Sequence, residues 1–224
     1  MFVVIFEVQP RKERRDDYLA LARQLKPALE AIDGFIDNER FESKRTKGRL
    51  LSLSAWRDEK SVVRWRTHGG HHTVQEKGRF EVFEDYHLRV GEVTADSGPP
   101  KGLAPEQQRF DETEIGAAKA VTLTEITPRA GAELDADAAA LLKQLRCDPA
   151  PDGLAGSEVF ESITNQGKLI LLAAWRDAGA AAGWKPKQFT DAQAVRHRGV
   201  RVIRDYGMFE RREAPQFYPA VKRA

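Results

Sequence analysis

The feature that most constrains the fold of this chain is an internal repeat. Residues 41–58 and residues 160–177 both begin with Phe-Glu-Ser and both end with Ala-Trp-Arg-Asp. These stretches are 119 residues apart, and Trp65 keeps the same spacing to Trp184. So many matches in the same order predict two copies of one structural unit, called copy one and copy two below.

The spacing between matching residues changes by one residue at each end of the repeat. The opening strands match at a spacing of 118, and the Asp-Tyr pair at residues 85–86 matches the pair at residues 205–206 at a spacing of 120. The stretch between the copies is rich in turn-forming and polar residues, and Phe110 and Ile115 are expected to anchor it. The expected parts are copy one at residues 1–95, a joining segment at 96–118, copy two at 119–212 and a tail at 213–224.

Each copy is predicted to fold as β-α-β-β-α-β. In copy one the expected strands are residues 2–9, 35–44, 49–57 and 80–93, and the expected helices are residues 11–32 and a second helix capped by Asp58. Gly34 is expected to end the first helix. This ferredoxin-like arrangement covers one face of its sheet with helices and leaves the other face bare. The fold class is therefore predicted as α+β, with the two units closing an intramolecular barrel.

Composition excludes several classes of protein. Hydrophobic residues make up 41% and charged residues 31%, which is typical of a globular chain. No apolar run reaches the roughly 18 residues of a membrane helix, and the apolar N-terminus indicates a strand and not a signal peptide. The net charge of +2 lacks the basic surplus of a nucleic-acid-binding protein. One cysteine, Cys147, cannot form an intrachain disulfide, so the cytoplasm is the expected compartment.

Several motifs of copy one resemble the antibiotic biosynthesis monooxygenase family. They are the stretch 41–58, Trp65-Arg66 with His68, Gln75, Gly78-Arg79 and Phe83-Glu84-Asp85-Tyr86. The resemblance covers residues 1–95 well and residues 119–212 more weakly. It implies a dimeric α+β barrel with a pocket between the helices and the sheet. The family includes quinone-forming monooxygenases that use no cofactor, haem-degrading enzymes and many members of unknown role.

The candidate catalytic residues lie after Trp65. If this helix is continuous, Trp65, His68, His72 and Gln75 form one stripe that would line the family's pocket. His68 or His72 would then take a phenolic proton as the catalytic base. Gly69-Gly70 favours an interruption, and in that case His71 would point inward instead of His72. The predicted substrate-binding residues are Trp65, Arg66, His71, Gln75 and Tyr86.

Neither a metal nor a cofactor is predicted. His68 and His72 have the spacing of zinc-binding helices, but no carboxylate or cysteine at ligand spacing joins them. The haem-degrading branch uses an asparagine on the first strand, a tryptophan on the second helix and a histidine about ten residues later. The matching positions look like Glu7, Trp65 and Gln75, so only the tryptophan is kept. Haem degradation is therefore not expected.

Copy two lacks these imidazoles. At a constant spacing, His68, His71, His72 and Gln75 are replaced by Lys187, Thr190, Asp191 and Ala194. Copy two is therefore expected to be a structural partner. The aromatic residues present in both copies are interpreted as architecture, with Tyr86 facing the core between the sheets. Glu7 and Glu125 lie on strands and are each expected to need a charged partner across the barrel.

Two functions fit these observations. The first is a monooxygenase that oxidises a small aromatic or polyketide-like compound without a cofactor. The second is a non-catalytic ligand-binding or stress-response module on the same barrel. The expected partner is a small aromatic substrate, with no nucleic acid and no membrane, and the fused pair of copies is open to further pairing as a homodimer.

Overall fold

The strands and helices follow the predicted order in both copies. The computed structural model describes residues 1–132, 137–186 and 191–222. Copy one contains β1 (Phe2–Pro10), α1 (Arg15–Glu30), β2 (Phe35–Ser43), β3 (Leu50–Trp56), α2 (Glu59–Arg66), α3 (Gly69–Lys77), the π-helical turn η1 (Gly78–Val82) and β4 (Phe83–Asp96). Copy two contains β5 (Ala120–Pro128), α4 (Ala138–Gln144), β6 (Leu154–Ser162), β7 (Leu169–Trp175), α5 (Ala178–Gly183) and β8 (Ala192–Gly207).

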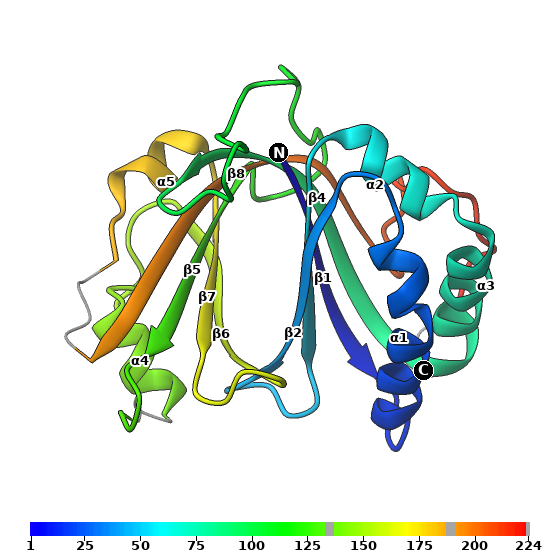
Figure 1. Ribbon diagram of the computed structural model, residues 1–224, viewed down its shortest axis with the longest axis horizontal. Coiled ribbons are helices and arrows are strands. Elements are labelled where there is room, and N and C mark those ends of the chain that lie inside the picture. The colour runs from blue at the N-terminus through cyan, green and yellow to red at the C-terminus, as the bar shows by residue number, and fades with distance from the viewer. Residues whose placement is uncertain (133–136, 187–190, 223–224) are drawn as a thin grey trace.

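The strands of the described residues close into one antiparallel barrel. Their order is β1-β3-β2-β6-β7-β5-β8-β4, so the two copies meet at the β2–β6 and β4–β8 seams. Figure 1 shows the helices of copy one and copy two on opposite sides of this barrel. Between the sheets, Val3, Ile5, Phe41 and Phe160 are fully buried. The predicted α+β barrel made of two ferredoxin-like units is confirmed.

Local signals in the sequence set several element ends. The Asp58 carboxylate accepts a hydrogen bond from the Ser61 backbone N–H at 2.8 Å, as the predicted helix cap requires. Gly34 has a φ of +88°, which suits a glycine after a helix. The last strand of copy one begins at Phe83 instead of residue 80, because residues 78–82 continue the helical path as η1.

The closing strands of the two copies align differently from the prediction. Glu7 on β1 lies opposite His87 on β4, and its counterpart Glu125 on β5 lies opposite Arg196 on β8. His87 therefore corresponds to Arg196, at a spacing of 109 (196 − 87) and not 120. The prediction that Tyr86 and Tyr206 are equivalent is wrong.

The error arises from an unrecognised gap. Trp56 and Trp175 end equivalent strands 119 residues apart, so copy two is ten residues shorter (119 − 109) before its last strand. The predicted replacements fall in or beside this gap. Lys187 and Thr190 lie outside the described residues, whereas Asp191 precedes β8 and Ala194 lies on it.

The segment between β4 and β5 contains no helix or strand, and it is held by polar contacts. The Glu92 carboxylate accepts hydrogen bonds from the backbone N–H groups of Gln108 and Arg109. Leu103 packs against the barrel core. Phe110 is 87% exposed, so the prediction that it anchors this segment is wrong.

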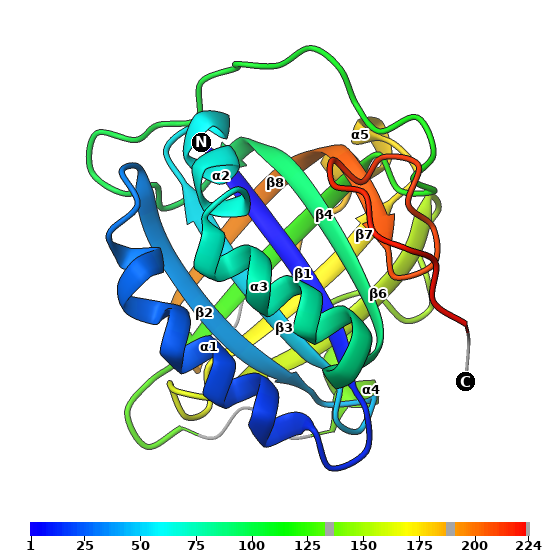
Figure 2. The ribbon, with the colours of Figure 1, turned by 90° about the vertical axis from the view of Figure 1, so that its right-hand side faces the viewer.

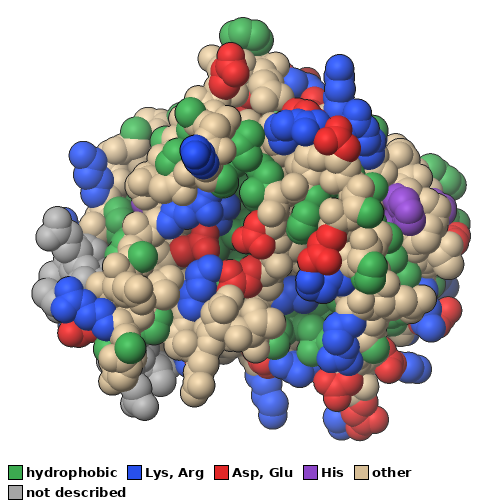
Figure 3. All heavy atoms as spheres, viewed as in Figure 1, with side chains coloured by type: hydrophobic (Ala, Val, Ile, Leu, Met, Phe, Trp, Pro, Cys, Tyr) green, Lys and Arg blue, Asp and Glu red, His purple; other side chains and the backbone are tan. Residues whose placement is uncertain are grey.

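The surface carries mixed charge. On the face shown in Figure 3, basic and acidic side chains are interspersed, as the near balance of 36 basic and 34 acidic residues suggests. None of the helices in the described residues is both long enough and apolar enough to cross a membrane.

Candidate active site

A cavity of about 190 Å³ lies between the sheet of copy one and its helices. Figure 2 shows α1 and α3 crossing the outer face of this sheet, with α2 above them. The cavity wall is mainly apolar and includes Val4, Phe6, Leu21, Leu25, Val62, Val74, Leu88 and Val90. An apolar cavity of roughly 150 Å³ is large enough to hold a benzene-sized ligand, so this one can hold a somewhat larger molecule.

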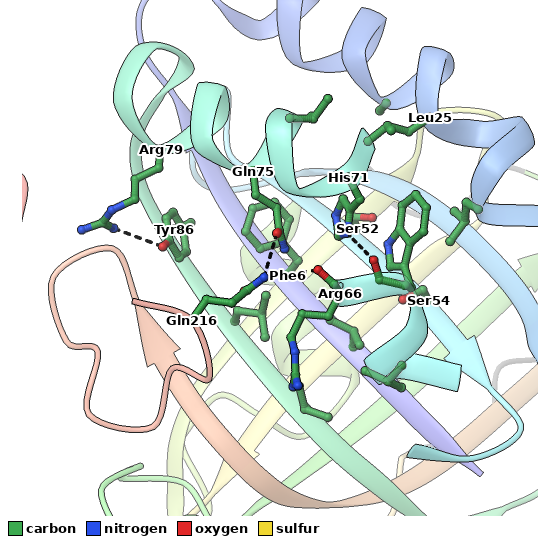
Figure 4. A pocket seen from close by; sticks show the side chains of 18 of the residues that line it. Phe6, Leu25, Ser52, Ser54, Arg66, His71, Gln75, Arg79, Tyr86 and Gln216 are labelled. Atoms are coloured by element: carbon green, nitrogen blue, oxygen red, sulfur yellow. Dashed lines mark hydrogen bonds between the residues drawn. The ribbon is translucent and has the colours of Figure 1, made fainter. Parts of the chain in front are cut away.

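The helix after Trp65 is broken, and the break decides which imidazole reaches the cavity. α2 ends at Arg66, and the His68 backbone is extended (φ −64°, ψ 125°) before α3 begins at Gly69. The predicted stripe of Trp65, His68, His72 and Gln75 therefore does not form. The alternative prediction was that Gly69-Gly70 interrupts the helix and turns His71 inward. The structure agrees with it, because His71 lines the cavity (Figure 4).

The His71 ring is held by two contacts with Trp65. Its Nδ1 lies 3.0 Å from the Trp65 carbonyl oxygen, and the two rings stack at 4.1 Å with 14° between their planes. A carbonyl oxygen can only accept, so Nδ1 carries the hydrogen and Nε2 keeps its lone pair. No described residue forms a hydrogen bond with Nε2. Burial lowers the pKa of His71 to about 4, so the ring is neutral near pH 7.

The two predicted catalytic histidines lie elsewhere. The His68 ring stacks on Trp65 at 5.7 Å, and His68 is not part of the cavity wall. His72 is exposed and stacks on Tyr218 at 5.8 Å. Among the residues that the structure describes, no group of three or more His, Cys, Asp or Glu side chains is arranged to hold a metal ion.

Tyr86 faces this cavity and not the core between the sheets, which corrects the prediction of its direction. Its ring packs on Phe6 with centroids 5.7 Å apart. Its hydroxyl oxygen accepts hydrogen bonds from Arg79 Nη1 at 3.2 Å and from Arg211 Nη1 at 2.7 Å. Because guanidinium groups only donate, the hydroxyl hydrogen of Tyr86 is left to donate to a ligand.

Copy two and the tail after it also contribute to the cavity. Arg204 and Tyr206 come from β8, and the segment after β8 adds Arg211, Gln216 and Tyr218. They reach the cavity because β8 pairs with β4. Sequence reasoning missed all five residues. The signal that would have found them is the requirement that the last strands of both copies pair in a closed barrel.

Arg66 and Arg204 place positive charge at the cavity edge. Neither side chain forms an ion pair within the described residues, and both charges act on the Tyr206 hydroxyl. Burial, together with the neighbouring Tyr86, raises the pKa of Tyr206 to about 12 against the opposing charge of the nearby arginines, so the phenol stays protonated. Glu59 also lines the cavity, but its carboxylate is paired with Arg109 at 2.6 Å, so Arg66 and Arg204 are cations of the wall without an ion-pair partner among the described residues.

Glu7 lies on the other side of the sheet from the cavity. Its carboxylate accepts hydrogen bonds from Arg89 at 2.8 Å and from Arg49 at 2.7 Å inside the barrel. Glu125 is paired in the same way by Arg198 and by Lys168. Each carboxylate has partners, as predicted, but they come from neighbouring strands and turns of the same copy and not from across the barrel. The position matched to the asparagine of the haem-degrading branch therefore does not reach the cavity.

Comparison with known proteins identifies the family. Residues 1–77 match the antibiotic biosynthesis monooxygenase family. A protein of Pyricularia oryzae named jasmonate monooxygenase ABM is 46% identical over 224 residues, covering 98% of this chain and 99% of that protein. The chain belongs to the antibiotic biosynthesis monooxygenase family. The alignment spans nearly the whole of both proteins, so this family member shares with its relative the region that supplies β8 and the segment after it.

Solved structures agree on the fold of this family member. An aldoxime dehydratase in complex with butyraldoxime superposes with a TM-score of 0.56 at 14% identity, covering 90% of this chain and 79% of that one. A second aldoxime dehydratase structure gives a TM-score of 0.54 at 14% identity, with coverage of 90% and 81%. At this level of identity the likeness concerns the fold alone.

Proposed function

We propose that this chain is a monooxygenase whose substrate is a small, mainly apolar acid bound in the cavity of copy one. The observation that carries this proposal is the combination of apolar walls with the unpaired guanidinium groups of Arg66 and Arg204 at the cavity edge. An anion that leaves water needs a cation or several hydrogen-bond donors in its place. Jasmonate, for which the full-length relative is named, is a carboxylate with a cyclopentanone ring and a hydrocarbon side chain, so it belongs to this class of mainly apolar acids.

The wall suggests an orientation for such a substrate. The carboxylate lies at Arg66 and Arg204, and the apolar body packs against Phe6 and Leu25. The Tyr86 hydroxyl then donates to an oxygen of the substrate or of the reacting dioxygen. Hydroxylation of a saturated carbon consumes one dioxygen, two protons and two electrons and releases one water, so this substrate class requires an external two-electron donor.

A hydroxylated aromatic compound is the second candidate substrate, and the stacked pair of Trp65 and His71 favours it. A flat ring can lie beside this stack and offer its hydroxyl to the free Nε2 of His71. Loss of the phenolic proton makes the ring electron-rich. A ring carbon that carries two hydrogens can then react with dioxygen, which converts that carbon to a carbonyl group and releases one water. The substrate supplies all the electrons, so this reaction needs no cofactor.

Proton transfer to His71 has a large cost that the site must offset. A phenol with an ordinary pKa near 10 and an imidazole with a pKa of about 4 differ by about 8 kcal/mol. The phenolate and the imidazolium would form an ion pair, and Arg66 and Arg204 would stabilise the phenolate as well. His71 can therefore act as a base only if the site stabilises the phenolate that proton transfer produces.

Oxygen uptake and product mass test both candidates. Jasmonate and a set of hydroxyanthrones are each supplied with and without a two-electron donor. Arg204→Gln is expected to raise KM for jasmonate about 10- to 150-fold, because a charge-assisted bond to the carboxylate is worth roughly 1.5–3 kcal/mol. Arg212→Gln, an exposed residue paired with Glu210, is the matched control and is expected to leave KM unchanged.

Three outcomes separate the proposals. Turnover of jasmonate only with the donor supports the acid, and turnover of an anthrone without it supports the aromatic substrate. Binding without oxygen uptake by either class supports the non-catalytic ligand-binding module. An Arg204→Gln variant that binds jasmonate as well as the unmodified protein overturns the proposed carboxylate site.

A further inference from the structure

The segment after β8 forms part of the cavity wall, to which it contributes Gln216 and Tyr218. It runs beside α3 on the side of copy one, and Figure 4 shows Gln216 reaching from it toward Gln75. Gln216 Nε2 donates to Gln75 Oε1 and to the Arg66 carbonyl oxygen, both at 3.2 Å. The Tyr218 ring stacks on His72, and its hydroxyl lies 3.2 Å from His72 Nδ1.

Side chains along this segment alternate between the cavity and solvent. Gln216 and Tyr218 are half-buried and line the cavity, whereas Phe217 between them is 91% exposed. Only the first two can contact a ligand. Phe217 is similar in size to Tyr218 and lies on the same segment, but it does not line the cavity, so it can serve as a control position.

The backbone of the segment is held by two arginines on both sides of Gln216 and Tyr218. Arg79 is 2% exposed and donates to the carbonyl oxygens of Met208 at 2.7 Å and Pro219 at 3.1 Å. Arg211 donates to the Gln216 carbonyl oxygen at 2.8 Å. These charge-assisted bonds position the backbone. The Gln216 side chain is joined to α2 and α3 by neutral hydrogen bonds, whereas the Tyr218 ring also lies 5.3 Å from the Arg211 guanidinium and 5.9 Å from that of Arg79. Because the arginine hydrogen bonds go to backbone carbonyl oxygens, substitution of the Gln216 or Tyr218 side chain leaves those bonds in place.

We propose that Gln216 and Tyr218 determine which substrates the cavity accepts, by setting the length of molecule that fits beneath them. This inference rests on the proposed function of the cavity as the substrate site. A longer molecule of the same class must displace the Gln216 and Tyr218 contacts before it can lie on the sheet. In an apolar pocket, one methylene group that does not fit changes kcat/KM by about 10- to 200-fold, so a small wall can produce strong selection.

A series of jasmonate-type acids with progressively longer alkyl side chains tests this inference. The unmodified protein is expected to lose kcat/KM sharply beyond one chain length. In Gln216→Ala and Tyr218→Ala, the ratio of kcat/KM between the long and the short acid is expected to rise about 10-fold. Phe217→Ala is the matched control and is expected to keep the ratio of the unmodified protein.

A further variant distinguishes the steric effect of the Tyr218 ring from the effect of its hydroxyl group. Tyr218→Phe keeps the ring on His72 and loses only the hydroxyl, so it is expected to keep most of the selectivity that Tyr218→Ala loses. Thermal unfolding of each variant checks that the segment has not disturbed the fold.

The outcomes distinguish this inference from the proposed function. If the unmodified protein neither binds nor oxidises any acid of the series, the proposed function fails. If it accepts the short acid and the long-to-short ratio is the same in Gln216→Ala and Tyr218→Ala, the role of the segment in substrate selection is overturned.

Discussion

The outer faces of the two copies differ, although their sheets have the same strand order. In copy one a cavity separates the helices from the sheet. In copy two the corresponding space is occupied by a buried cluster that includes Leu141, Leu145, Trp175 and Trp184. The comparison shows that this sheet can carry either a cavity or a closed core on its outer face, depending on the segments that cover it.

The two copies also differ in chain length before the last strand. Copy one has α2, α3 and η1 between β3 and β4, whereas the described residues of copy two have only α5 between β7 and β8. The ten residues absent from copy two correspond in number to most of α3 and η1. The first helices differ as well, because Leu141 and Leu142 of α4 belong to the buried cluster of copy two, whereas Leu21 and Leu25 of α1 line the cavity of copy one.

The paired tryptophans show the same contrast. Trp184 is 7% exposed, packs on Trp175 at 5.5 Å and donates its indole N–H to the Arg146 carbonyl oxygen at 3.3 Å. Trp65 is only half-buried, and its ring forms part of the cavity wall. The same tryptophan position is thus a buried core residue in copy two and a cavity-wall residue in copy one.

The largest expected effect concerns these two residues. Trp184→Ala is expected to destabilise the protein by about 3–5 kcal/mol, because it empties a packed core. Trp65→Ala is expected to cost clearly less and to weaken ligand binding, since it borders existing space. Denaturant unfolding and titration with jasmonate measure the two quantities. Equal losses of stability would contradict the contrast between the two faces.

A smaller effect is expected from pH. The pKa of His71 falls from an ordinary value of 6.5 to about 4 on folding, mainly through burial. Between these values the unfolded chain binds a proton that the folded chain does not, so stability falls as pH falls. The expected loss by pH 4 is about 2–3 kcal/mol, at about 1.36 kcal/mol per pKa unit. The free energy of unfolding, measured between pH 7 and pH 4, tests this.

His71→Phe should remove this part of the pH dependence, and His72→Gln, at an exposed position, should retain it. His197 of copy two also has a pKa lowered by burial and contributes a loss of the same sign in every variant. The same slope in His71→Phe and in the unmodified protein would show that His71 is not the group responsible.

The smallest expected effect concerns the helix caps. Asp58 and Asp177 each accept a hydrogen bond from a backbone N–H three residues later, at 2.8 Å in both copies. Asp58→Ala is expected to cost about 1 kcal/mol and to weaken ligand binding, because α2 carries Trp65 and Arg66. Asp177→Ala should cost less and leave binding unchanged. Loss of binding in Asp177→Ala would indicate that the two faces are coupled.

The sequence by itself determined the fold. The repeat predicted two equal units, the helical and strand periodicities predicted their elements, and Gly34 and Asp58 marked two helix boundaries. These signals are local, since each depends on residues close together in the chain. The bare sheet face of each unit then left closure of a barrel as the way to bury it.

Only the tertiary structure decided the site. Whether His71 or His72 faces the cavity depends on the backbone angles of His68 at the helix break, which the surrounding packing sets. The gap before β8 was hidden because a chance Asp-Tyr pair gave a plausible alignment, and only strand pairing located it. Arg204, Gln216 and Tyr218 reach copy one through the β4–β8 seam, a contact between segments more than 100 residues apart that no local pattern contains.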